Sequence, residues 1–156
     1  MSIEKVREYF RQFEMENRIL ESELSSATVE LAAKAFNCES DRIAKSLSFK
    51  VDEKPVLILC SGEVRIDNQK YKGKFKTKAK MLSPDEVREL IGHEIGGVCP
   101  FGINEGVSVY LDNSLKKYQT VFPACGSSNS AIELTPDELE KYSSAIEWVD
   151  VCKERE

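Results

Sequence analysis

The sequence predicts one mixed α/β (α+β) domain in which helices surround a central pair of strands. Its length of 156 residues is that of one ordinary domain. Helix-like and strand-like segments alternate along the chain, and no low-complexity linker separates them. We therefore expect residues 1–156 to form a single domain.

Two helices are predicted in the N-terminal part. Over residues 2–15 apolar side chains recur at spacings of three and four, which is typical of an amphipathic helix: Ile3, Val6, Phe10 and Phe13. A second helix is predicted to follow Thr28, whose side chain can accept hydrogen bonds from the first free amides, and to end near Asn37.

A strand hairpin is predicted for the centre of the fold, after a short turn at residues 40–44. Apolar Leu47, Phe49 and Val51 alternate with polar residues, the period of a strand with one buried face. A turn at 52–55 leads to VLILC at 56–60, which is apolar throughout, as expected for a strand covered on both faces.

Two later helices have clear start signals. Ser83 and Thr135 are each followed by Pro-Asp-Glu, which combines a hydroxyl N-cap, a proline in the first turn and a capping-box glutamate. Four further runs have strand composition: residues 107–111, 119–122, 131–134 and 148–151.

Composition excludes several functional classes. There is one histidine, His93, so zinc sites and Ser-His or Cys-His nucleophiles are disfavoured, and we expect it to cap the helix that begins at Ser83. The five cysteines contain no CxxC pair, so we expect no metal and no cofactor. Their odd number, without a recognisable secretory leader or an apolar run of membrane-spanning length, predicts reduced thiols in a cytoplasmic protein.

Six lysines alternate through KYKGKFKTKAK at residues 70–80. They carry +6 in a chain whose net charge is −5, so the remainder carries −11. In a strand all six would share one face, and in a helix they would spread around the axis. Lys72, Lys74 and Lys76 are therefore candidates for steering an RNA backbone. The alternative is a solvated lysine-rich edge that prevents aggregation.

Candidate site residues lie in two glycine-containing loops and at Lys45. The loops GGVCPFG at 96–102 and CGSSNS at 125–130 can present backbone amides to a phosphate or an oxyanion, although tight turns are the simpler explanation. Lys45 precedes the central hairpin and can hold a phosphate or carbonyl oxygen, or extend into solvent. Cys99 and Cys125 are expected to line a pocket, with no base nearby to generate a thiolate.

Four motifs resemble, in order, the YbaK/EbsC family, the prolyl-tRNA synthetase associated editing domain. They are IAKSLSF at 43–49, SGEVRID at 61–67, GGVCPFG at 96–102 and GSSNSAIELTPDEL at 126–139. The resemblance covers about residues 28–151. It implies a barrel-like, mostly antiparallel mixed sheet surrounded by helices.

The resemblance also implies an activity and a site. The activity is hydrolysis, in trans, of a mischarged amino acid from tRNA, expected to be tRNA for proline carrying alanine or cysteine. The reaction would use a water and the substrate's own ribose hydroxyl, with no metal. The catalytic residues would be Lys45, which anchors the substrate, and the backbones of Gly97 and Gly126. The substrate-binding residues would be Ser46, Gly96, Cys99, Pro100, Phe101, Gly102, Ser127 and Asn129. The implied partners are the acceptor end of aminoacyl-tRNA and prolyl-tRNA synthetase, with no membrane.

Two alternatives from other classes remain open at this stage. The same pocket can hold a nucleotide or an acceptor end without turnover, as a binding module docked on a synthetase. A thiol enzyme that uses Cys99 or Cys125 is the third reading.

Overall fold

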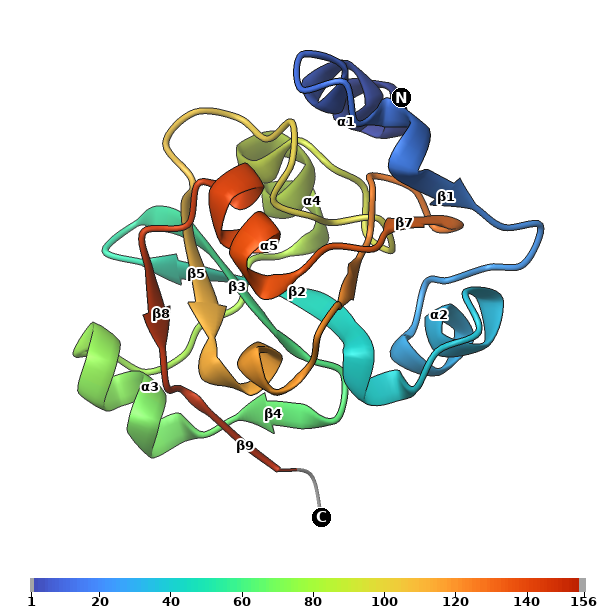
Figure 1. Cartoon of the computed structure of the whole chain (residues 1–156). Coiled ribbons are helices and arrows are strands. Elements are labelled where there is room, and N and C mark those ends of the chain that lie inside the picture. Colours follow the sequence, from blue (N-terminus) through green and yellow to red (C-terminus); the bar gives the residue numbers. More distant parts are fainter. Residues whose placement is uncertain (1, 155–156) are drawn as a thin grey trace.

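A computed structural model describes residues 2–154 and is built around one mixed five-stranded sheet (Figure 1). The order in the sheet is β6-β2-β3-β5-β8. The strand bounds are β2 (Ile43–Val51), β3 (Lys54–Ser61), β5 (Ser108–Asp112), β6 (Phe122–Pro123) and β8 (Glu147–Val149). The predicted hairpin is confirmed: β2 and β3 pair antiparallel from Ala44↔Ser61 to Val51↔Lys54 and lie inside the sheet.

Two short antiparallel ribbons extend this sheet into a curled, half-barrel arrangement. One pairs β1 (Ile19–Glu21) with β7 (Ser130–Ile132), and the other pairs β4 (Val64–Ile66) with β9 (Cys152–Glu154). The mixed sheet agrees with the sequence prediction. Within the five-stranded sheet, however, β2–β6, β3–β5 and β5–β8 are parallel, because long crossovers rather than tight turns connect these strands.

Helices surround the sheet, as the sequence predicts. They are α1 (Ser2–Arg11), α2 (Val29–Ala35), α3 (Asn68–Phe75), α4 (Pro84–Glu86), which continues into a π-helical turn at Val87–Ile91, and α5 (Pro136–Ser143). In Figure 1, α2 lies beside the first residues of β2, and α3 lies next to β4 and β9. Within residues 2–154 there are also three 3-10 turns: Glu16–Arg18, Ser40–Arg42 and Asn113–Lys117.

The start signals read from the sequence are confirmed. Thr28 accepts from the Leu31 amide at the start of α2. Ser83 and Thr135 each form a complete capping box. The first helix ends at Arg11 rather than near residue 15, because Glu14 adopts a left-handed φ of 57° that no helix can continue.

The core lies on both faces of β3. Leu57 and Leu59 pack in one cluster with residues of the π-helical turn 87–91 and of α5, whereas Ile58 and Cys60 pack with Tyr71 of α3 on the other face. Residues 57–60 are completely buried, which confirms the expectation that this strand is covered on both sides.

Candidate functional site

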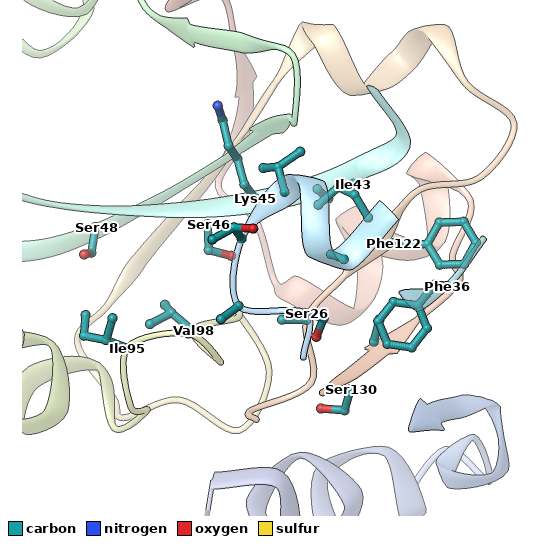
Figure 2. A pocket seen from close by; sticks show the side chains of 18 of the residues that line it. Ser26, Phe36, Ile43, Lys45, Ser46, Ser48, Ile95, Val98, Phe122 and Ser130 are labelled. Atoms are coloured by element: carbon teal, nitrogen blue, oxygen red, sulfur yellow. The ribbon is translucent and has the colours of Figure 1, made fainter. Parts of the chain in front are cut away.

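A cavity of about 230 Å³ lies between α2 with its preceding loop, the first half of β2 and the loop at 95–98 (Figure 2). Its closed end is apolar and belongs to a small core cluster; the side chains there are Ala32, Phe36, Ile43, Phe122 and Ala131. At the opposite end Met81 and Ile95 line it while remaining 59% and 58% exposed. The cavity therefore has a closed apolar end and an open mouth.

One wall of the cavity is made by two segments that lie far apart in the sequence. Ser22 N donates to Asn129 O (2.8 Å), Ser26 N donates to Ser128 O (2.5 Å), and the Asn129 side-chain amide donates back to Ser22 O (3.0 Å). These bonds extend the β1–β7 pairing and hold the segment that leads into α2 in place. Asn129 therefore supports the wall and does not itself line the cavity.

Lys45 lies on β2, opposite Cys60 of β3, and lines the cavity. Its Nζ donates to the main-chain carbonyls of Val64 (2.5 Å) and Gly62 (3.4 Å). In Figure 2 the ammonium points away from the hydroxyls of Ser26 and Ser130. Both partners are neutral carbonyls and Lys45 has no ion pair within residues 2–154, so its positive charge is not cancelled there.

Only glycine fits at position 62, whose main-chain carbonyl accepts a hydrogen bond from Lys45. A Cβ at this position would lie 2.2 Å from Ser40 O and 2.6 Å from a methyl carbon of Val29. The turn after β3 therefore packs directly against the start of α2, and the same turn presents the Gly62 carbonyl to Lys45.

Two hydroxyl groups in the cavity have no hydrogen-bond partner among the described residues 2–154. Ser26 Oγ and Ser46 Oγ are both buried and unpaired, whereas Ser130 Oγ lies 2.6 Å from Ser127 Oγ, which donates to Asn129 Oδ1 (2.8 Å). An unpaired buried hydroxyl is costly, so a ligand with polar groups near Ser26 and Ser46 would recover that free energy.

The glycine loop is only partly in the cavity. Gly96, with φ 96°, lies between Ala27 and Ser128 and lines it. Gly97 packs directly on the 126–127 backbone, and its amide donates to Glu94 O (3.1 Å). Gly97, Gly126 and Ser127 line a separate hollow on the other side of the loop, together with His93.

Val98 also lines the cavity, whereas the last four residues of the GGVCPFG motif lie outside it. Cys99 and Phe101 are completely buried in the main core, and Pro100 and Gly102 line a hollow next to α1. Burial raises the pKa of the Cys99 thiol to about 12 and also raises the pKa of Cys125. These thiols are core residues rather than pocket wall, which argues against their use as nucleophiles.

His93 is not the charged helix cap that its sequence position suggests. It is 1% exposed, with Nε2 2.8 Å from Phe101 O and 3.4 Å from Cys99 Sγ. Burial lowers its pKa, so the ring is neutral near pH 7. It does not line the cavity that contains Lys45.

Several lining residues were missed by sequence reasoning, chiefly Ser26, Val29, Ala32, Phe36, Met81 and Phe122. Ala32 and Phe36 had a signal, because their i, i+4 spacing places them on one face of the predicted helix. The others come from segments that only the folded chain brings together.

Within residues 2–154 no group of three or more His, Cys, Asp or Glu side chains is arranged to hold a metal ion. In the same range no helix is both long and apolar enough to cross a membrane.

Comparison with known proteins places this geometry in a family. The model of the aminoacyl-tRNA editing domain matches residues 24–142. The protein YwhH of Bacillus subtilis (strain 168), described as uncharacterized, is 55% identical over the whole length of both chains. A proline–tRNA ligase of Bacillus cereus (strain AH820) is 29% identical over 102 residues, which are 65% of this chain and 18% of the ligase.

A solved structure agrees over almost the whole chain. It is described as a proposed trans-editing enzyme for prolyl tRNA synthetase, is 32% identical, covers 97% of both chains and superposes with a TM-score of 0.87. Together with the match to residues 24–142, this likeness shows that the chain belongs to the aminoacyl-tRNA editing domain family.

Proposed function

We propose that this protein is a trans-editing enzyme that hydrolyses the ester of a mischarged aminoacyl-tRNA. The observation that carries the proposal is the cavity itself, because its closed apolar end lies next to unpaired hydroxyls and an uncancelled lysine charge. A small aminoacyl group fits such a closed end, and its phosphate-bearing nucleotide would remain near Lys45. Family membership supports the reaction class.

Hydrolysis of this ester needs few catalytic groups from the protein. An aminoacyl ester is already activated, so orientation and charge stabilisation supply much of the catalysis. Lys45 would anchor the terminal nucleotide or the ester carbonyl after leaving the Gly62 and Val64 carbonyls. A water molecule and the substrate's ribose hydroxyl would together supply the attacking oxygen and move the proton, so no histidine base is needed. This is consistent with His93, which is buried outside the cavity.

The acyl group is proposed to be small. The closed end is bounded by Ala32, Phe36, Ile43 and Phe122, which suits alanine or cysteine on tRNA for proline. The Ser26 and Ser46 hydroxyls would accept hydrogen bonds from the α-ammonium group or form hydrogen bonds with a small polar side chain. Prolyl-tRNA synthetase is the proposed partner, supported by the similarity to part of proline–tRNA ligases.

The test is hydrolysis of a panel of mischarged tRNAs by the purified protein and by Lys45→Ala. Removing a group that stabilises developing charge costs about 10²–10³ in rate, so we expect a loss of about 100-fold in kcat/KM for the preferred ester. Lys54→Ala is the matched control, since Lys54 is an exposed lysine at the start of β3 and does not line the cavity.

The outcomes separate the candidate functions. If no ester is lost faster than in buffer while tRNA still binds, the protein is a binding module for the acceptor end. If Lys45→Ala hydrolyses esters at the parent rate, the assignment of Lys45 is wrong.

A further inference from the structure

The lysine-rich segment at 70–80 is divided into two classes by the structure. Lys70 and Lys74 lie one turn apart on α3 and form ion pairs with Asp150 and Glu147 of the C-terminal segment. Lys70 Nζ also donates to the Cys152 carbonyl (3.0 Å). The charges of Lys70 and Lys74 are therefore paired within the folded chain.

The other lysines are exposed and have no ion pair within residues 2–154. Helix α3 ends at Phe75, and Lys76 turns the chain out of the helix with φ 63°. Beyond it, exposed Lys76, Lys78 and Lys80 alternate with half-buried Thr77 and Ala79. Ala79 packs on the cluster around Tyr71, so the three lysines project from the outward side of an extended segment.

This extended segment leads directly to the mouth of the cavity. Lys50 N donates to Lys80 O (2.8 Å), and Leu82 N donates to Ser48 O (3.1 Å), so residues 80–82 pair with β2. Met81, between these two bonds, is one of the exposed residues that line the open end. Ser48 lies at this end of the cavity in Figure 2.

The charge distribution favours one kind of occupant. The chain has a net charge of −5, and outside residues 70–80 it carries −11. A polyanion is repelled by most of this surface and attracted to the uncompensated lysines. An apolar partner would gain nothing from these charges, whereas a nucleic-acid strand carries one charge per residue along the lysines and can place its terminal residue in the cavity.

We propose that Lys76, Lys78 and Lys80 form a phosphate track that guides the single-stranded 3′ end of an RNA to the cavity mouth at Met81. The inference rests on the proposed function, because it supplies the path by which a tRNA acceptor end reaches the site. Lys72 and Lys74, which alternate with Lys76 in the sequence, lie on α3 and are not part of the track.

The track is tested by the salt dependence of binding to uncharged tRNA, which needs no hydrolysis. The variant is Lys76→Gln/Lys78→Gln/Lys80→Gln. The control, Lys116→Gln/Lys117→Gln/Lys141→Gln, makes the same charge change at exposed lysines that do not line the cavity. Each phosphate contact on a single strand contributes about 0.7 to the slope of log K against log salt. Three contacts therefore contribute about 2 to this slope.

We expect the parent protein and the control to lose about 20-fold more affinity than the track variant between about 50 and about 200 mM salt. A tRNA trimmed of its single-stranded 3′ end should bind the parent and the track variant equally. In hydrolysis assays the variant should raise KM for charged tRNA and leave kcat unchanged.

Three results would overturn the inference: an unchanged salt slope in the track variant, an equal effect of the control, or no binding of uncharged tRNA by the parent at about 50 mM salt. An unchanged slope with increased aggregation would instead assign the lysines to protection of the sheet edge. If the track variant loses tRNA affinity but the parent hydrolyses no ester, the track stands and the proposed enzyme does not.

Discussion

Replacement of Gly97 by alanine probes the packing between the two glycine loops. A Cβ at Gly97 would lie 2.5 Å from Ser127 N and 2.6 Å from the carbonyl carbon of Gly126. Both contacts are with backbone atoms, which cannot rotate away as a flexible side chain can. Gly97 does not have a positive φ, so the strain comes from this close approach and not from the backbone conformation of Gly97 itself.

The expected cost follows from the distance. Ordinary carbon contacts are about 3.5–4.0 Å, so the loops would have to separate by about 1 Å to accept the methyl group. Inserting a methyl into a packed region of this kind costs about 1–3 kcal/mol. The displaced segment, 126–129, also holds the wall of the cavity through Asn129 and Ser22, so hydrolysis should fall together with stability.

The assay is urea unfolding followed by far-UV circular dichroism, with Gly73→Ala as the matched control. Gly73 lies inside α3, and a Cβ there would have no atom within 4 Å. The same substitution should therefore stabilise the protein by about 0.5–1 kcal/mol through helix propensity. The reasoning is refuted if Gly97→Ala unfolds at the parent midpoint, or if both variants shift in the same direction.

Two further predictions concern an ion pair and the closed end of the cavity. Hydrogen bonds from Arg18 lower the pKa of the Glu138 carboxyl from 4.5 to about 2 in the folded protein. The stabilisation that ionised Glu138 gives to the folded protein is therefore complete above about pH 4.5 and is lost as the pH falls towards 2. Glu138→Gln should cost about 1 kcal/mol at pH 7, with the difference from the parent shrinking on acidification; an unchanged difference at pH 2.5 would contradict it. Ala32→Leu should fill part of the closed end and slow hydrolysis of the preferred ester about 10-fold or more, while the thermal midpoint stays within a few degrees; unchanged rates for every ester would show that this end does not hold the acyl group.

Local signals in the sequence were reliable where the physics is local. A capping box needs only a hydroxyl and a glutamate three residues apart, and both predicted boxes form. The continuous apolar run at 56–60 could be recognised as a doubly covered strand without knowledge of its neighbours. The three-residue strands β1, β4 and β9 had no such signal, since each is held by pairing with a distant partner.

The motifs read from the sequence contribute residues to the cavity, but the sequence does not tell which of their side chains face it. Lys45, Ser46 and Gly96 line the cavity, whereas Cys99 and Phe101, from the same motif as Gly96, are core residues. Side-chain direction within an irregular loop depends on its packing against the rest of the chain, and no periodicity records it.

The sequence by itself determined the single mixed domain, the starts of its main helices, the central hairpin and the chemical limits set by one histidine and scattered cysteines. Only the tertiary structure decided where the cavity lies, because its walls come from six separated parts of the chain between residues 26 and 131. It also decided which lysines remain uncompensated. Lys70 and Lys74 find their acidic partners 80 and 73 residues away, and charge pairing at that separation is a property of the fold rather than of the local sequence.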